Sequence, residues 1–250
     1  MKKLLAMILI LTLILSITVF HGAGAQAADA GYKIGSVVTF GSYEQDGDKA
    51  NGREPVEWIV VDKRGDGSLV LISRYALDAK PYNEEFTVVT WENCTLRKWL
   101  NEEFYTSAFS AREQSLIVPV MLQNEDNPYY GTDGGNDTTD KVWLLSINEA
   151  TDYFGNDKVF SYFTDDESRL CGPTVYAARA QTVRQGGDYV FEPASPCVWW
   201  LRSPGDYAGC ASYVLYDGFV IFVGCDVDDV GDDLGSADCF VRPAVVVRVS

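Results

Sequence analysis

Short apolar runs alternate with glycine-rich turns along the first third of the chain. Residues 37–40 and 56–61 are rich in valine and aromatic side chains, and residues 69–73 form a third apolar run after a Gly-Asp-Gly turn. Such runs between turn signals are typical of β-strands. The pattern therefore predicts three strands here. A valine-rich run at residues 245–249 predicts the last strand of the chain.

The middle of the chain changes to helical spacing. Trp91, Trp99 and Phe104 recur at roughly helical intervals with leucines beside them, which predicts one amphipathic helix over residues 93–105. A turn is expected near Ala111. Aromatic side chains at this spacing pack a core more often than they stack on a ligand, so we interpret them as core.

A second apolar segment, residues 142–146, predicts a buried strand. A short helix is expected to start at Ile147, with Ser146 or Asn148 as its cap. The tract before this segment, residues 127–140, is rich in Asp and Asn and could hold a calcium ion. The competing interpretation is a solvated loop stiffened by side-chain-to-backbone turns, and we favour it.

The N-terminus predicts a secretory signal peptide over residues 1–30. A basic start precedes the apolar residues 4–20, and small residues follow. We expect cleavage between Ala27 and Gly31, and an uncleaved anchor is the alternative. The mature residues 31–250 are enough for one sizeable domain, and the protein is expected to be secreted or associated with the cell surface.

Charge and histidine content exclude several functions. The net charge of −16 argues against nucleic acid, and against an anionic membrane surface after signal cleavage, because both bind basic footprints. The only histidine, His21, lies in the expected signal peptide. Mechanisms that need imidazole, such as a Ser-His-Asp triad or His-ligated zinc, are therefore excluded from the mature chain.

The C-terminal fifth of the chain has two core-like brackets. Trp199 and Trp200 open it, and residues 241–244 (Val-Arg-Pro-Ala) close it. The two tryptophans carry large apolar area. Arg202 and Arg242 stand beside Ser-Pro-Gly and Pro-Ala, so we expect backbone carbonyls or a carboxylate to hold each guanidinium.

Between the brackets, residues 206–240 contain no Lys, Glu, Gln, Trp or Met. No codon that ends in C encodes any of these five amino acids. One interpretation is that these positions come from codons with a fixed third base and randomised first and second bases. The competing interpretation is an acidic loop region whose composition lacks the five types.

This segment resembles the C-terminal signature of an uncharacterised family of secreted bacterial domains. That signature has a Trp-Trp-Leu-Arg-Ser-Pro-Gly block, then Ala-x-x-Val, Gly-x-Val and a Gly, and ends in Gly-Val-Arg-Pro-Ala. The matching positions are residues 199–205, Ala211, Val214, Gly218, Val220, Gly224 and residues 241–244. The chain departs at Phe240, where the family usually has glycine. Residues 54–61 also fit the family, so the resemblance spans the mature chain.

Some family members look like the variable proteins of diversity-generating retroelements, in which template adenines are randomised. Their fold is C-type-lectin-like and is distantly similar to that of formylglycine-generating enzymes. The resemblance therefore implies a single α+β, C-type-lectin-like domain with residues 206–240 as a variable region. It also implies that the last strand lies near the first, at Val37, because lectin-like domains bring their termini together.

The function that this implies is binding of an unknown protein or glycan, without catalysis or a cofactor. Side chains that vary must be exposed, because exchanging buried ones destroys the fold. The residues assigned to the ligand-binding surface are Asp206, Tyr207, Gly209, Cys210, Ser212, Tyr213, Leu215, Tyr216, Asp217, Phe219, Ile221, Phe222, Val223, Cys225, Asp226, Asp228 and Asp229. Those expected to point inward or make turns are Ala211, Val214, Gly218, Val220, Gly224 and Val227.

Two alternatives stay open. One is an oxidase similar to formylglycine-generating enzymes, which use a copper-binding cysteine pair. Cys225 and Cys239 are the nearest candidates, although the motif around them does not match. The other is a structural cell-surface module, in which the variable stretch would be an ordinary loop.

The remaining expectations concern cysteine and calcium. Cys171 and Cys197 stand in segments that fit the family, and an exported chain meets an oxidising environment, so we expect them to form a disulfide. The carboxylates from Asp226 to Asp233 half resemble a calcium loop but lack a Glu at the twelfth position, where Ala237 stands. We therefore expect adventitious calcium binding at most and no dedicated metal site.

Overall fold

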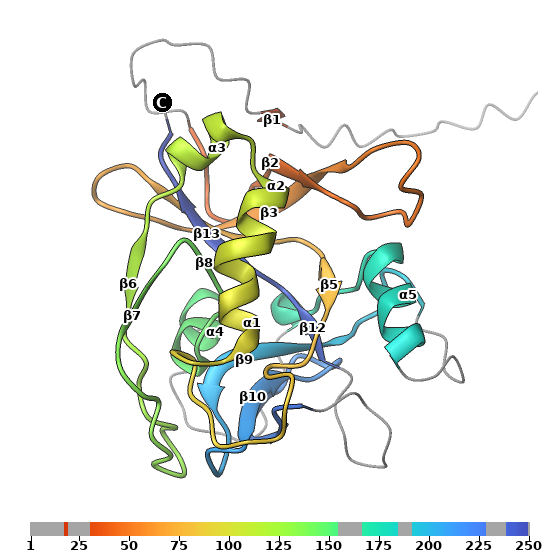
Figure 1. Ribbon diagram of the computed structural model, residues 1–250. Helices are drawn as coiled ribbons and strands as arrows, with labels where there is room; N and C mark the ends of the chain where they lie inside the picture. The colour runs from red at the N-terminus through yellow and green to blue at the C-terminus, as the bar shows by residue number, and fades with distance from the viewer. Residues whose placement is uncertain (1–17, 20–30, 155–166, 185–191, 229–238, 250) are drawn as a thin grey trace, which may run out of the picture.

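Two β-sheets carry most strands of the computed structural model, which describes residues 18–19, 31–154, 167–184, 192–228 and 239–249 (Figure 1). Helices cover the sheets, so the chain is a mixed α+β protein, as expected. Most of the predicted signal peptide lies outside the described residues. Within them, no helix is long and apolar enough to cross a membrane.

The first sheet contains the strands that the N-terminal pattern predicted. Its order is β1 (Thr18–Val19), β2 (Val37–Tyr43), β3 (Glu54–Lys63), β4 (Leu69–Ser73), β13 (Ala244–Val247) and β8 (Val142–Trp143). The last strand therefore shares a sheet with the first predicted strand, but β3 and β4 lie between β13 and β2. β13 pairs antiparallel with β4 and β8, so the expected proximity holds at the level of the sheet.

The second sheet contains the C-terminal signature. Its order is β11 (Val220–Asp226), β10 (Cys210–Val214), β9 (Val198–Pro204), β12 (Cys239–Val241) and β5 (Asp78–Ala79). β12 runs parallel to β9, and the chain then passes through Pro243 into β13 of the first sheet. A separate hairpin joins β6 (Val120–Leu122) and β7 (Thr138–Asp140).

The predicted long helix is confirmed as a continuous run of three elements, α1 (Thr95–Trp99), the π-helix η1 (Leu100–Phe104) and α2 (Tyr105–Ala108). The turn expected near Ala111 is instead the start of α3 (Ala111–Leu116), because Ser110 and Glu113 form a reciprocal capping box that nucleates a new helix.

Ser146 caps α4 (Ile147–Phe154), as expected: its Oγ accepts a hydrogen bond from the Glu149 N–H at 3.1 Å. The strand before α4 ends at Trp143, earlier than predicted. Two further helices are η2 (Glu167–Arg169) and α5 (Val175–Arg184).

The two bracketing segments are core, as predicted. Trp199 and Trp200 are fully buried. Arg202 donates to the Leu144 carbonyl at 3.0 Å and to the Glu149 carboxylate. Arg242 donates to the Ser73 carbonyl at 3.0 Å and lies over the Trp199 ring. Carbonyls, a carboxylate and an aromatic face therefore hold these buried charges, although Nη2 of Arg242 has no hydrogen-bond partner among the described residues.

Candidate binding surface

The β10–β11 hairpin carries most of the predicted surface residues, and its edge strand β11 alternates in burial. Ile221 is half-buried, Phe222 is 9% exposed and Val223 is 40% exposed. All three were expected to be exposed. Phe222 is a correction, because successive side chains of a strand point to opposite faces and this one faces the core.

The other assigned residues divide in the same way. Exposed are Asp206, Tyr207, Tyr216, Val223 and Asp226. Half-buried are Tyr213, Leu215, Asp217, Phe219, Ile221 and Asp228. Buried are Gly209, Cys210, Ser212, Phe222 and Cys225. Asp229 lies outside the described residues. The inward set is confirmed at Ala211, Val214, Gly218, Val220 and Val227, which are buried, and Gly224, which makes a kink with φ +74°.

The buried members of the assigned set are corrections, and those on β10 have a common cause. β10 lies between β9 and β11, so its residues meet neighbours on both sides. Ser212 is fully buried and donates its hydroxyl to the Pro204 carbonyl at 2.8 Å. The buried Cys210 directs its thiol to Asp226 at 3.4 Å. These positions serve the fold and are not available to a ligand.

The hairpin also separates the exposed residues into two groups. Cys210 pairs with Asp226 at one end, and Val214 pairs with Val220 at the other. Four residues of strand span about 13 Å. Tyr216 therefore lies at the far turn, away from Tyr207 and Asp226, and the single contiguous surface that was expected is not formed by the hairpin alone.

Loops from elsewhere in the chain join the end that holds Tyr207. In Figure 1 the loop that follows β5, the β6–β7 loop and the start of β10 meet at the lower end of the molecule. The Val89 N–H donates to the Ala208 carbonyl at 3.0 Å, and the Thr132 hydroxyl donates to the Asp206 carbonyl at 2.9 Å. The Asn83 N–H donates to the Val227 carbonyl at 2.7 Å. These hydrogen bonds therefore hold the C-terminal stretch through its main-chain carbonyl groups.

Asn127 is the centre of this arrangement. Its buried side-chain amide donates to the carbonyls of Pro204 and Phe222, each at 2.8 Å, and to that of Gly205 at 3.2 Å. Its Oδ1 accepts the N–H groups of Tyr129 and Tyr130. This confirms the interpretation of the Asp- and Asn-rich tract as a loop stiffened by Asx turns.

The loops bring exposed apolar side chains that the sequence interpretation missed. Phe86, Val88, Tyr129 and Tyr130 are all at least 40% exposed. Together with Asp206, Tyr207, Val223 and Asp226 they form a surface that we call the aromatic end. The rings of Phe86 and Tyr207 both lie beside Gly209. The sequence signal that could have indicated this surface is the adjacent pair Tyr129 and Tyr130, because polar, glycine-rich loops are usually exposed.

Gly205 and Gly224 allow neighbouring backbone segments to approach each other closely at this end. A Cβ at Gly205 would lie 2.3 Å from the Val223 carbonyl oxygen, and one at Gly224 would lie 2.5 Å from that of Ala211. Both obstacles are backbone, so a side chain would force the strands apart. These two positions cannot vary even if their neighbours do.

Electrostatics at the aromatic end centre on Tyr207. Its hydroxyl donates to Asp226 Oδ1 at 2.6 Å. This hydrogen bond raises the pKa of the Tyr207 phenol above its ordinary value. Burial raises the pKa of Cys210 to about 12, so its thiol stays protonated at neutral pH. The site therefore presents carboxylates and aromatic faces and no activated nucleophile among these residues.

Four of the six cysteines belong to the two pairs that the sequence suggested. The Cys197 N–H donates to the Cys171 carbonyl at 2.8 Å, so the two residues are neighbours. Both are thiols in the structure, so the expected disulfide stays a prediction. Cys225 on β11 and Cys239 on β12 are three strand positions apart, about 14 Å at ordinary spacing. They do not form the pair that copper would need.

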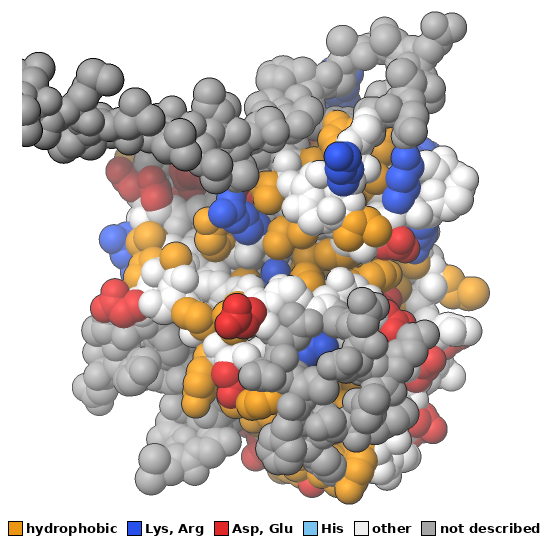
Figure 2. Space-filling model, turned by 180° about the vertical axis from the view of Figure 1, so that it is seen from behind, with side chains coloured by type: hydrophobic (Ala, Val, Ile, Leu, Met, Phe, Trp, Pro, Cys, Tyr) orange, Lys and Arg blue, Asp and Glu red, His pale blue; other side chains and the backbone are white. Residues whose placement is uncertain are grey.

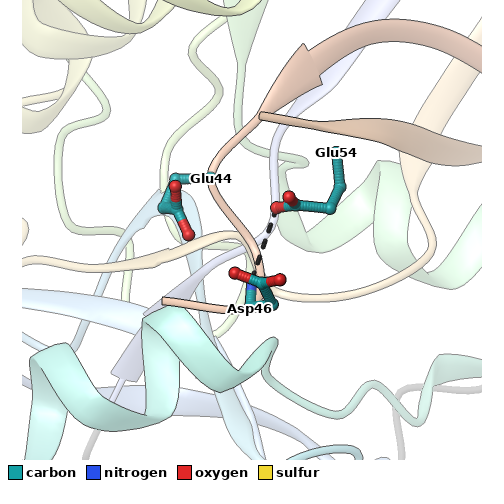
Figure 3. Close-up of side chains that lie close together, drawn as sticks. All are labelled: Glu44, Asp46 and Glu54. Carbon is teal, nitrogen blue, oxygen red and sulfur yellow. Dashed lines mark hydrogen bonds between the residues drawn. The ribbon is translucent and has the colours of Figure 1, made fainter. Parts of the chain in front are cut away.

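A group of three carboxylates lies elsewhere, at the β2–β3 hairpin. The carboxylate oxygens of Glu44, Asp46 and Glu54 lie within 4.8 Å of one another (Figure 3). Each already accepts backbone N–H groups: Glu44 from Gly47, Asp46 from Asp48, and Glu54 from Gln45 and Asp46. We interpret these carboxylates as the hydrogen-bond acceptors that hold the loop of the β2–β3 hairpin closed.

Residues 66–249 match the model of a family described as a domain of unknown function (DUF6273). The chain belongs to this family. No curated protein and no solved structure matches it. The matched range includes every residue of the aromatic end, whereas the carboxylates of the β2–β3 hairpin precede it.

Proposed function

We propose that this chain is a secreted ligand-binding protein whose aromatic end displays diversified side chains on a C-type-lectin-like scaffold. The observation that carries the proposal is the way in which this end is held. Asn127, Thr132 and the Val89 N–H all bind main-chain carbonyls of residues 204–222. Side chains there can change without breaking these bonds.

The exposed side chains suit recognition. Tyrosine and phenylalanine offer large, rigid contact area at low conformational entropy, which is why paratopes are enriched in tyrosine. An exposed cluster of such side chains usually marks an interaction site. Five of the residues assigned as variable are exposed, and the composition of residues 206–240 supports codons with a fixed third base. The variable-protein resemblance accounts for both features.

A folding test addresses the proposal directly. In one library, the codons of Asp206, Tyr207, Val223 and Asp226 are randomised. In a matched library, those of Ala211, Ser212, Val214 and Phe222 are randomised. Both are displayed on yeast and scored for protease resistance. We expect most members of the first library to fold and few of the second, because polar replacements at buried sites cost about 1–3 kcal/mol or more.

Equal loss of folding in the two libraries would contradict a display surface and favour a structural module. The flanking DNA supplies a second test. Diversification requires a near-copy of the C-terminal coding region that differs at adenines, beside a reverse transcriptase gene. A neighbourhood without these elements would remove the diversified part of the proposal and leave a fixed binding surface.

A further inference from the structure

The three stretches that build the aromatic end share an extreme charge pattern. Their described residues, 81–96, 122–140, 203–228 and 239–241, contain twelve Asp and Glu and no Lys or Arg. All 20 basic residues of the chain lie elsewhere. In the view from behind, the coloured side chains along the lower rim are red or orange (Figure 2). The charge and the exposed apolar surface therefore coincide at one end of the molecule.

Of the described carboxylates in these stretches, Asp140 takes part in an ion pair, whereas the exposed Asp206 and Asp226 do not. Among the described residues, the ion pairs join Arg74 to Glu57, Arg97 to Asp140, and Arg202 to Glu149. The last two fix the loops behind the surface. Asp206 and Asp226 take part in none of these pairs and are exposed, so their charge is directed to solvent.

Aromatic faces lie beside these carboxylates. Tyr207 donates its hydroxyl to Asp226 at 2.6 Å, and the Phe86 ring lies next to it across Gly209. A guanidinium or ammonium group is attracted both to the face of an aromatic ring and to a carboxylate. The combination recognises cationic side chains better than it recognises neutral or acidic ones.

We infer that the aromatic end binds a basic segment of a partner protein, with Lys or Arg side chains inserted between Phe86, Tyr207 and the carboxylates Asp206 and Asp226. This inference rests on the proposed function and names its partner class. A neutral glycan would make no use of the charge, and an acidic glycan or nucleic acid would be repelled. Complementary charge also speeds association, with a strong dependence on salt.

The test uses the mature chain and three synthetic dodecapeptides. Each contains two tryptophans at fixed positions. Six of the other ten positions hold arginine, serine or glutamate, and the remaining four are the same in all three peptides. Fluorescence anisotropy gives Kd at 50 mM and at 300 mM salt. We expect the arginine peptide to bind about tenfold or more tightly than the serine peptide, to weaken at high salt, and the glutamate peptide not to bind.

Matched charge-removing variants separate a site from general attraction. Asp206→Asn with Asp226→Asn removes two charges at the aromatic end while it keeps the oxygen that Tyr207 contacts. Glu102→Gln with Glu103→Gln removes two exposed charges from η1. The first pair should weaken the arginine peptide about tenfold, and the second less than twofold.

Three results would overturn the inference: equal weakening by both pairs, tighter binding of the serine peptide, or no binding of the arginine peptide at millimolar concentration. The proposed function fails by a different readout, the loss of folding in the surface library. A serine peptide that binds and is lost in Phe86→Ala with Tyr207→Ala would keep the binding surface and reject the cationic partner.

Discussion

β9 and the aromatic end, which consists of loops and part of the edge strand β11, are held in opposite ways. On β9 the side chains make the contacts: the indole N–H groups of Trp199 and Trp200 donate to the carbonyls of Arg169 and Lys80, at 3.2 and 3.0 Å. At the aromatic end the main chain is held and the side chains are directed outward. Packing therefore constrains the side chains of β9, whereas the hydrogen bonds that hold the aromatic end do not depend on its exposed side chains.

The largest effect is expected where side chains hold the frame. Trp199→Ala should lower the free energy of unfolding by about 3–5 kcal/mol, because it removes a fully buried indole and leaves a cavity. Urea denaturation followed by circular dichroism measures this. Tyr216→Ala, which truncates an exposed aromatic residue, is the control and should change little. A small effect of Trp199→Ala would break the distinction between the two regions.

The thiol pair before β9 should come next in size. Oxidation of Cys171 and Cys197 would close a loop of about 26 residues and stabilise the protein by about 3 kcal/mol. Mass mapping of unreduced peptides from exported protein should find the linked pair, and a reducing agent should lower the melting temperature. Finding both as thiols in the exported protein would count against it.

A substitution at Asn127 tests whether hydrogen bonds to main-chain carbonyls hold this end of the molecule. Asn127→Ala removes the amide that donates to the carbonyls of Pro204, Gly205 and Phe222, of which Pro204 keeps the Ser212 hydroxyl as a donor, and an unsatisfied buried polar group costs about 1–3 kcal/mol. The amides of Tyr129 and Tyr130 should also lose protection from hydrogen exchange, because Oδ1 no longer accepts them. Asn136→Ala, at an exposed asparagine that bonds Glu92, is the control. Unchanged protection would show that the loop is held by other contacts.

The frame also contains a buried acid, Asp78 on β5. Burial raises its pKa, although the hydrogen bond from the Tyr43 hydroxyl opposes this. The folded state then binds the proton more tightly than the unfolded state, so this group destabilises the fold as pH rises above the unfolded value of about 3.9. Asp78→Asn should therefore be more stable than wild type at pH 7, with a smaller difference at pH 3.5. Thermal unfolding across this range checks the sign, and a less stable variant at pH 7 would reverse it.

Much of the frame was predictable from local pattern, and the composite surface was not. The strands near Val37 and Leu69 and the helix from Thr95 follow from apolar spacing and turn signals. The burial of Ser212 and Phe222 depends on which strands flank β10 and β11, and spacing does not specify pairing. Phe86 was missed because its neighbourhood with Tyr207 arises only through hydrogen bonds between distant segments.

The smallest effect is expected at Val223, and its neighbour gives the sharpest contrast. Val223 and Phe222 are consecutive on β11 but face opposite sides, 40% and 9% exposed. Val223→Ala should change the free energy of unfolding by no more than about 0.5 kcal/mol. Phe222→Ala should cost about 3–5 kcal/mol, as for a core phenylalanine. Both variants keep the backbone bonds to Asp206 and Asn127, so the difference isolates the side chains. Equal losses would mean that residue identity matters on both faces of β11, which a diversified strand could not tolerate.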